Sequence, residues 1–200
     1  MTSIGPGLTV SYTEFSPGEL SQMTGFSQDL QRVWRKRGQL AGSSGKTARF
    51  NVLKVAELFV RHELSLWGIS PKDSIVVGSE AAPNVLYFAL LNGDGACQVT
   101  GTLSQAEKFI AEFAGGDEIA REMSGCTDNS RFIWSPQRND FRMAADMGPL
   151  LAQEIHTSIL VLDLGAMGTT LANRATRPLF SVHGPTLASE RTVRKLTNAQ

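Results

Sequence analysis

Apolar residues recur at helical spacing along the first third of the chain. Leu20 and Met23 lie three positions apart in a short segment that opens with Ser16 and Pro17, a pair typical of a helix N-cap and first turn. Gly25 follows them as a helix stop. The pattern therefore predicts a short first helix.

A second helix, with the sequence QDLQRVWRKRG, is predicted after Ser27 as its N-cap, with Gly38 at its end. Leu30, Val33 and Trp34 fall at i, i+3 and i+4 and form one apolar face, so Trp34 is expected in the core. Several polar and basic residues of the helix are left to point outward. Two short helices joined by a Gly-containing turn, the second one basic, follow the helix-turn-helix pattern. Phe26 is the expected apolar plug of the turn.

Two extended segments, 39–41 and 47–50, flank a Gly-Ser-Ser-Gly turn and predict a small hairpin, or wing. Lys46 and Arg49 lie on or near its tip. A third helix is predicted to follow Asn51 as its cap, because apolar residues return at helical spacing. These residues are Val52, Val55, Ala56, Phe59 and Val60.

The stretch from His62 to Trp67 either continues the third helix or starts a short fourth one, and both Phe59 and Trp67 are expected in the core. Gly68 and the Ser70-Pro71 pair end this unit. After it the pattern becomes mostly extended. Strands are predicted at 75–77, 84–91, 96–100, 131–134 and 158–164.

A turn signal at 92–95, Asn-Gly-Asp-Gly, predicts that the strands on either side of it form a hairpin. Helices are predicted at 102–113 and 149–156, with weak helical character over 117–130. Residues 171–182 fit either a helix followed by a strand or one irregular strand.

These elements predict an α+β fold, in which an N-terminal winged helix-turn-helix domain precedes a mixed α+β domain with a mostly antiparallel sheet. The predicted organisation has four parts: an N-terminal extension at 1–14, the winged helix-turn-helix at 15–74, an α+β oligomerisation or effector domain at 75–183, and a polar tail at 184–200.

The charges sum to zero, with 19 Lys+Arg and 19 Asp+Glu, but they are unevenly distributed. Residues 31–61 hold eight basic residues and one acidic residue, Glu57, for a local charge of +7. The rest of the chain therefore carries −7. Such asymmetry is typical of a module that faces a polyanion, joined to an acidic partner domain. A solvated basic face with no partner is the alternative.

A hydrophobic fraction of 42% and a charged fraction of 19% are ordinary for a soluble globular protein and exclude a disordered, coiled-coil or collagen-like chain. No apolar run approaches the roughly 18–20 residues that span a bilayer. The N-terminus has no signal-peptide pattern. The two cysteines, Cys97 and Cys126, are too few for a disulfide scaffold and lack metal-ligand spacing. A reduced, cytoplasmic protein without membrane contact is expected.

The run GELSQMTGFSQDLQRVWRKRGQL, the Gly-rich wing closed by an aromatic residue, and a helix ending in LWGIS carry a resemblance to a known family. On these landmarks, residues 15–74 resemble the DNA-binding domain of MerR-type regulators. The residues at approximately the positions of the family's Arg-aromatic, charged-pair and Gly-Leu pattern are Arg32, Trp34, Arg35, Arg37, Gly38 and Leu40.

Three departures from the family pattern lie within this region. Gln39 separates Gly38 from Leu40, Val33 stands where an aromatic is common, and the wing ends in Arg49-Phe50 instead of Arg-x-Tyr. The family also continues with a long dimerisation helix, and no heptad pattern follows here.

A helix in the major groove reads base edges with polar or basic side chains near its N-terminus, Gln pairing with adenine and Arg with guanine. The base-edge candidates are Gln28, Asp29, Gln31 and Arg32. Phosphate contacts give affinity and register but little sequence information. The phosphate candidates are Ser27, Arg35, Lys36, Arg37, Lys46 and Arg49.

The sequence thus predicts a transcription regulator of bacterial or phage type that binds duplex DNA sequence-specifically as a homodimer and is associated with the nucleoid. RNA polymerase or another regulator is a further expected partner. One alternative is an excisionase-like recombination accessory factor that bends DNA. Another is a ligand-binding protein or enzyme whose basic domain docks to a partner protein.

No catalytic constellation, metal site or cofactor motif is predicted elsewhere, so the chain is not expected to be an enzyme. The segment 165–170 lacks the Lys and the Gly spacing of a phosphate loop and fits a strand-to-helix turn. His156 and His183 have no neighbouring ligand set. Cys97 and Cys126 fit either inert thiols or a redox or metal sensor. One further carboxylate, Asp163 at the end of a strand, is a possible ligand contact.

Overall fold

The computed structural model describes residues 2–3, 9–40, 48–93, 95–101, 117–136, 140–148 and 159–184. Within these residues the fold is mixed α+β, with six helices and three small sheets, which confirms the predicted class. The predicted helices at 102–113 and 149–156, Lys46 with the wing turn, and the polar tail beyond Gly184 lie outside the described residues.

The first helix, α1 (Pro17–Thr24), forms where the sequence predicts it because its first turn is capped from both sides. The Ser16 hydroxyl accepts from the Glu19 backbone N–H at 3.3 Å, and the Glu19 carboxylate accepts from the Ser16 N–H at 2.7 Å. Gly25 ends the helix in a left-handed conformation, at φ 77°, that costs glycine little.

The next two helices also begin at their predicted caps. In α2 (Gln28–Lys36) the Ser27 hydroxyl accepts from the Leu30 N–H at 3.2 Å. In α3 (Val52–Leu66) the Asn51 side chain accepts from the Lys54 N–H at 2.8 Å. Each cap satisfies a backbone donor that the first turn of a helix leaves unpaired.

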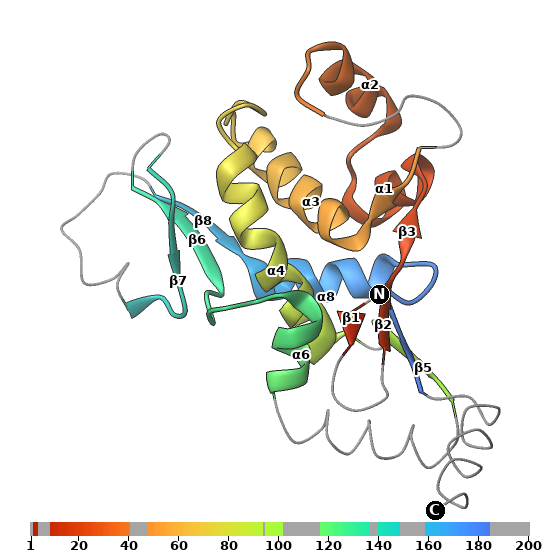
Figure 1. The fold of residues 1–200 in the computed structure, drawn as a ribbon. Helices are drawn as coiled ribbons and strands as arrows, with labels where there is room; N and C mark the ends of the chain where they lie inside the picture. The colour runs from red at the N-terminus through yellow and green to blue at the C-terminus, as the bar shows by residue number, and fades with distance from the viewer. Residues whose placement is uncertain are drawn as a thin grey trace, which may run out of the picture.

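The strands predicted at 75–77 and 84–91 are wrong, because both segments belong to one helix, α4 (Ile75–Asn92). This helix lies between α3 and α8 (Leu164–Arg174), so its apolar residues do not keep to one face and the 3.6-residue period is weak (Figure 1). Pro83 inside the helix is a further signal against a helix in the sequence.

The crossing of α4 and α8 is close because α8 presents Gly168 to the backbone of α4. A Cβ built on Gly168 would lie 2.4 Å from the Val85 carbonyl oxygen and 2.6 Å from the Ala89 nitrogen. The predicted strand-to-helix turn at 165–170 is instead the first part of α8 itself. The ambiguous segment 171–182 resolves as the end of this helix followed by a strand.

The largest sheet joins the two ends of the described chain. Its strand order is β1 (Thr2–Ser3), β2 (Thr9–Tyr12), β9 (Phe180–His183) and β5 (Cys97–Thr100). β5 and β9 are parallel and the other pairs are antiparallel. The predicted hairpin around 92–95 is therefore wrong, because β5 pairs with β9 and follows a helix.

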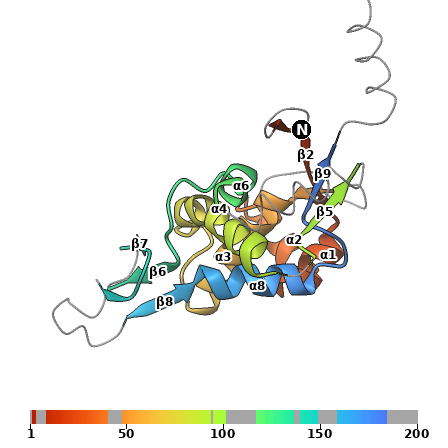
Figure 2. The same cartoon turned by 90° about the horizontal axis from the view of Figure 1, so that it is seen from below.

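A second sheet orders β7 (Arg142–Ala144), β6 (Phe132–Ser135) and β8 (Leu160–Asp163), all antiparallel. The strands predicted at 131–134 and 158–164 are thus confirmed in position. The α8 helix runs directly from β8 towards β9, and the two sheets lie at opposite sides of the helical layer in both views (Figures 1 and 2). The helix α6 (Asp117–Ser124) packs on α4 and matches the predicted helical character of that region.

The third sheet is a short pair of β3 (Glu14–Phe15) and β4 (Phe50–Asn51). Phe50, expected at the end of the wing, pairs with Phe15 from the N-terminal side of α1. Gln39 and Leu40, expected to begin the wing, form a bend in the structure. The winged arrangement as a whole remains a prediction, since the turn of the wing is not among the described residues.

One apolar cluster runs through the described residues from Val10 to Val182, across the predicted boundary at residue 74. Phe59 is buried in it as expected. Trp67, also expected in the core, is instead 68% exposed as the C-cap of α3, beyond Leu64, the last buried residue of that helix. The division into domains remains a prediction.

Candidate nucleic-acid interface

The turn between α1 and α2 holds the two helices together, because its residues Thr24 and Phe26 are buried. The Thr24 hydroxyl donates to the Leu20 carbonyl at 2.7 Å and accepts from the Phe26 N–H at 3.1 Å. Phe26 is fully buried, with its ring 4.6 Å from that of Trp34 and 5.6 Å from that of His62. The aromatic contacts hold α2 against α1 and α3, so its outer face is a rigid surface.

Gln31 does not read base edges, contrary to the sequence prediction, because it is completely buried. Its side-chain amide donates to the Pro17 carbonyl at 3.0 Å and to the Phe26 carbonyl at 2.9 Å. It therefore fastens α2 to the start of α1 and to the turn. Gln31 lies three residues before Trp34, and this helical spacing indicates that both side chains share the buried face of α2.

The outer face of α2 is one continuous exposed stripe that is polar except for Val33. Its exposed residues are Gln28, Asp29, Arg32, Val33, Lys36 and Arg37. In a helical projection these six fall on one half of the helix, while Gln31 and Trp34 point to the core. Val33 was expected on the apolar face, and its 40% exposure contradicts that expectation.

Three of the base-edge candidates are placed together at the N-terminal end of this stripe. Arg32 donates to the Asp29 carboxylate at 2.6 Å, and both side chains are largely exposed. An exposed ion pair of this kind contributes little to stability. Its effect is to orient the guanidinium along the helix. Gln28 lies one turn before Arg32 on the same side.

The phosphate candidates differ in accessibility. Lys36, Arg37 and Arg49 are exposed, whereas the Ser27 hydroxyl is already used as the helix cap. Arg35 is half-buried with its guanidinium 5.7 Å from the centre of the Phe50 ring. Its Nε and Nη2 atoms are buried without a hydrogen-bond partner in the described structure. Such donors are costly to leave unpaired, and because they are shielded from solvent a phosphate can reach them only if the Arg35 side chain moves.

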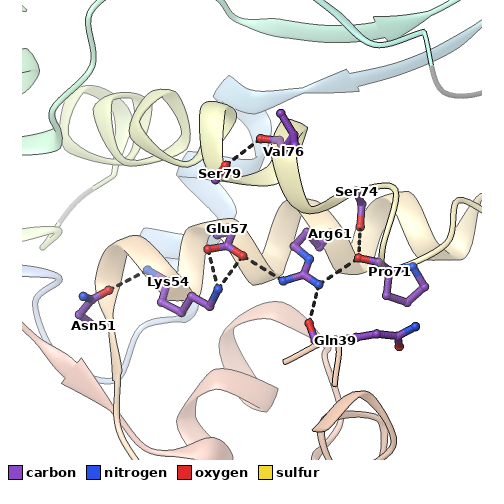
Figure 3. Close-up of polar contacts among 9 residues, drawn as sticks. All are labelled: Gln39, Asn51, Lys54, Glu57, Arg61, Pro71, Ser74, Val76 and Ser79. Atoms are coloured by element: carbon purple, nitrogen blue, oxygen red, sulfur yellow. Dashed lines mark hydrogen bonds and ion pairs between the residues drawn. The ribbon is translucent and has the colours of Figure 1, made fainter. Parts of the chain in front are cut away.

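Two of the eight basic residues in 31–61 form ion pairs with Glu57, the one acidic residue of the segment. Arg61 is 2% exposed and its guanidinium donates to the Glu57 carboxylate at 2.9 Å. Lys54 Nζ donates to the same carboxylate at 2.6 Å and 2.7 Å. Figure 3 shows the three side chains together along α3. The basic surface is therefore smaller than the local charge of +7 indicates.

Arg61 also joins three segments of the backbone. Its Nη2 donates to the Gln39 carbonyl at 2.7 Å and to the Pro71 carbonyl at 3.0 Å (Figure 3). Its guanidinium lies 5.1 Å from the centre of the Trp34 ring. The chain that follows α2 and the loop that leads into α4 are thus bound through one cation. The sequence contains no motif that marks this role.

His62 packs beneath the helix-turn-helix turn, and burial lowers the pKa of its imidazole below the ordinary value of 6.5, with the Glu63 carboxylate opposing this in part. The folded protein therefore favours the neutral ring, while the unfolded chain takes up a proton at higher pH. The contribution of the neutral His62 ring to the free energy of unfolding is therefore fully present above pH 6.5. It is lost as the pH falls through the folded-state pKa of this ring.

We expect the His62→Gln variant to lose part of this pH dependence. The measurement is the free energy of unfolding in urea at pH 7.5 and pH 5.5, compared between the variant and the wild-type chain. His183→Gln is the control and retains the dependence, since His62 is unchanged. Equal pH dependence in His62→Gln and the wild type would show that the buried ring is not its source.

The other candidate groups are occupied by structural contacts. Burial raises the pKa of the Cys97 thiol to about 11, so little thiolate exists near neutral pH. Cys126 is buried, its pKa is also raised by burial, and its Sγ–H donates to the Asp128 carbonyl at 2.7 Å. His183 hydrogen-bonds with Ser11 at 2.9 Å and with Thr100 at 2.8 Å across the sheet. His156 is not among the described residues.

Asp163 is bound within the protein. It caps α8 by accepting from the Ala166 N–H at 3.1 Å, and it accepts from Arg131 at 2.9 Å. Burial acts against its charged form, but these hydrogen bonds outweigh burial and lower the pKa of the carboxyl. Among the residues that the structure describes, no group of three or more His, Cys, Asp or Glu side chains could hold a metal ion.

No protein-family model, curated protein or solved structure matches this chain. The MerR-like resemblance of residues 15–74 therefore remains a prediction. Within the described ranges one helix, α4, is long and apolar enough to cross a membrane. Most of it is buried against α3, α6 and α8, which is the environment of a core helix.

Proposed function

We propose that the chain is a DNA-binding protein of the transcription-regulator class that inserts α2 into the major groove of duplex DNA. The observation that carries the proposal is the braced α1–α2 pair with its continuous exposed polar stripe. At the top of Figure 1, α2 stands beyond α1 and α3 at one end of the molecule. A projecting helix with polar and basic residues on its outer face is the geometry of groove recognition.

The side chains of the stripe divide by chemistry. Gln28 and Arg32 lie near the helix N-terminus and supply the amide and guanidinium groups that pair with adenine and guanine. Lys36 and Arg37 lie at the other end of the helix and suit phosphate contacts, together with Arg49. Asp29 orients Arg32 and disfavours a neighbouring phosphate.

A single helix of nine residues makes a small interface, so we propose that two copies bind two half-sites. RNA polymerase or a second regulator is the further protein partner that we propose for a regulator of this class. A cytoplasmic, nucleoid-associated location belongs to the same proposal.

Fluorescence anisotropy with a duplex oligonucleotide tests the function through its salt dependence. The phosphate candidates Lys36, Arg37 and Arg49, with Lys46 of the predicted wing, give about four contacts per copy and predict a slope of log K against log salt near −4, roughly doubled for a dimer. Replacing both Lys36 and Arg37 with alanine is expected to weaken binding to all duplexes and to reduce the slope by about 2 per copy.

Arg174→Ala is the matched control, because Arg174 is an exposed arginine at the end of α8 and is not part of the stripe. It is expected to leave both affinity and slope unchanged. A slope near zero for the wild-type chain would refute DNA binding. An equal loss of affinity in Arg174→Ala would place the DNA elsewhere on the molecule.

A further inference from the structure

Val33 is the one apolar residue on the exposed stripe of α2. Its side chain is 40% exposed, and Asp29 and Lys36 lie on the same face one turn before and after it. Part of the valine side chain therefore faces outward among polar and charged neighbours, on the face that is proposed to enter the groove.

The chemistry of the major groove supplies a partner for such a side chain. Thymine is distinguished there by its C5-methyl group, which proteins contact with small apolar side chains. The neighbouring Arg32 provides the group that pairs with guanine. A helix that presents both to one groove reads a thymine and a guanine at nearby base pairs.

We propose that Val33 is a specificity-determining residue that recognises a thymine methyl group in the bound DNA. The inference rests on the proposed DNA-binding function and deepens it by naming one element of the sequence that α2 reads. The contact needs no change in α2, because Val33 lies on the rigid outer face that the Phe26 and Gln31 contacts hold in place.

The test begins with duplexes selected by the wild-type protein from a random 20-base-pair library. Each thymine of the selected site is then replaced in turn by deoxyuridine, which removes only the methyl group. Loss of one buried methyl contact is expected to weaken wild-type binding about fourfold at one position of each half-site. At other thymines the replacement has little effect.

The Val33→Ala variant completes a double-mutant cycle. It is expected to bind the thymine-containing site about fourfold more weakly than the wild type and to be insensitive to the deoxyuridine replacement. Leu91→Ala is the matched control, since Leu91 is 41% exposed near the C-terminal end of α4 and is not part of the α2 stripe. It keeps the full sensitivity to the missing methyl group. Circular dichroism checks that both variants are folded.

The outcomes separate the inference from the proposed function. Salt-dependent selection of duplexes with no thymine sensitive to deoxyuridine would overturn the role of Val33 and leave DNA binding intact. The same conclusion follows if Val33→Ala loses equal affinity for the thymine and deoxyuridine sites, which would indicate a contact with the backbone or with another protein. Failure to select any duplex would overturn the proposed function itself.

Discussion

Replacing Arg61 with alanine is expected to lower the free energy of unfolding by about 3 kcal/mol, because it removes a buried cation and its hydrogen bonds, while Glu57 keeps Lys54 and the Pro71 carbonyl keeps Ser74. The variant loses the bond to Glu57 and the two bonds to the carbonyls of Gln39 and Pro71. It also leaves a cavity beside the Trp34 ring. The measurement is urea unfolding followed by tryptophan fluorescence.

The controls for Arg61 separate charge from geometry. Arg61→Lys keeps a positive charge, but its single nitrogen cannot replace both Nη1 on the Glu57 carboxylate and Nη2 on the two carbonyls, so an intermediate loss is expected. Arg49→Ala removes an exposed arginine that, among the described residues, hydrogen-bonds to the adjacent Ala48 carbonyl, and a change within about 0.5 kcal/mol is expected. A loss for Arg61→Ala no larger than that for Arg49→Ala would contradict the structural role assigned to Arg61.

Replacing Gly168 with alanine is expected to destabilise the fold by about 3 kcal/mol, at the upper end of overpacking effects. The added methyl group would meet backbone atoms of α4, at 2.4 Å and 2.6 Å, instead of the end of a flexible side chain. The two helices must therefore separate, and their packing on each other is the most extensive in the described fold. Thermal unfolding followed by circular dichroism measures the loss.

The matched substitution on the same helix is Gly165→Ala. A Cβ there would approach side-chain atoms, 3.0 Å from the Asp163 carboxylate and 3.2 Å from Arg131 Nε. Arg131 is exposed and can shift, so a change of no more than about 1 kcal/mol is expected. Equal losses in the two variants would mean that helix α8 does not depend on its close approach to α4.

Local signals predicted the helices well where neighbouring residues determine the structure. Ser16, Ser27 and Asn51 each cap the helix that the sequence assigned to them, because an N-cap bond spans only three residues. In contrast, α4 was predicted as strands, since a helix buried among other helices shows no amphipathic pattern. What makes this segment helical is its packing against α3, α6 and α8, most of which are distant in the sequence.

The predicted interface was partly wrong for a similar reason. The apolar face of α2 was assigned from Leu30, Val33 and Trp34, but Gln31 takes the buried place and Val33 the exposed one. A glutamine can be buried only where carbonyl groups accept its amide, and here these belong to α1 and the turn. Similarly, nothing near Arg61 in the sequence shows that it is buried.

The pairing of β2 with β9 sets the order in which the chain can fold during synthesis. Val10 and Val182 are opposite each other in this sheet, so the pairing of β2 with β9 must wait until almost the whole described chain has left the ribosome, although β2 can pair with β1 earlier. The caps and the turn of α1 and α2 use only neighbouring residues and can form early. The helices proposed to bind DNA are thus able to assemble while β2 still lacks its β9 partner, and the pairing of β2 with β9 closes the sheet late.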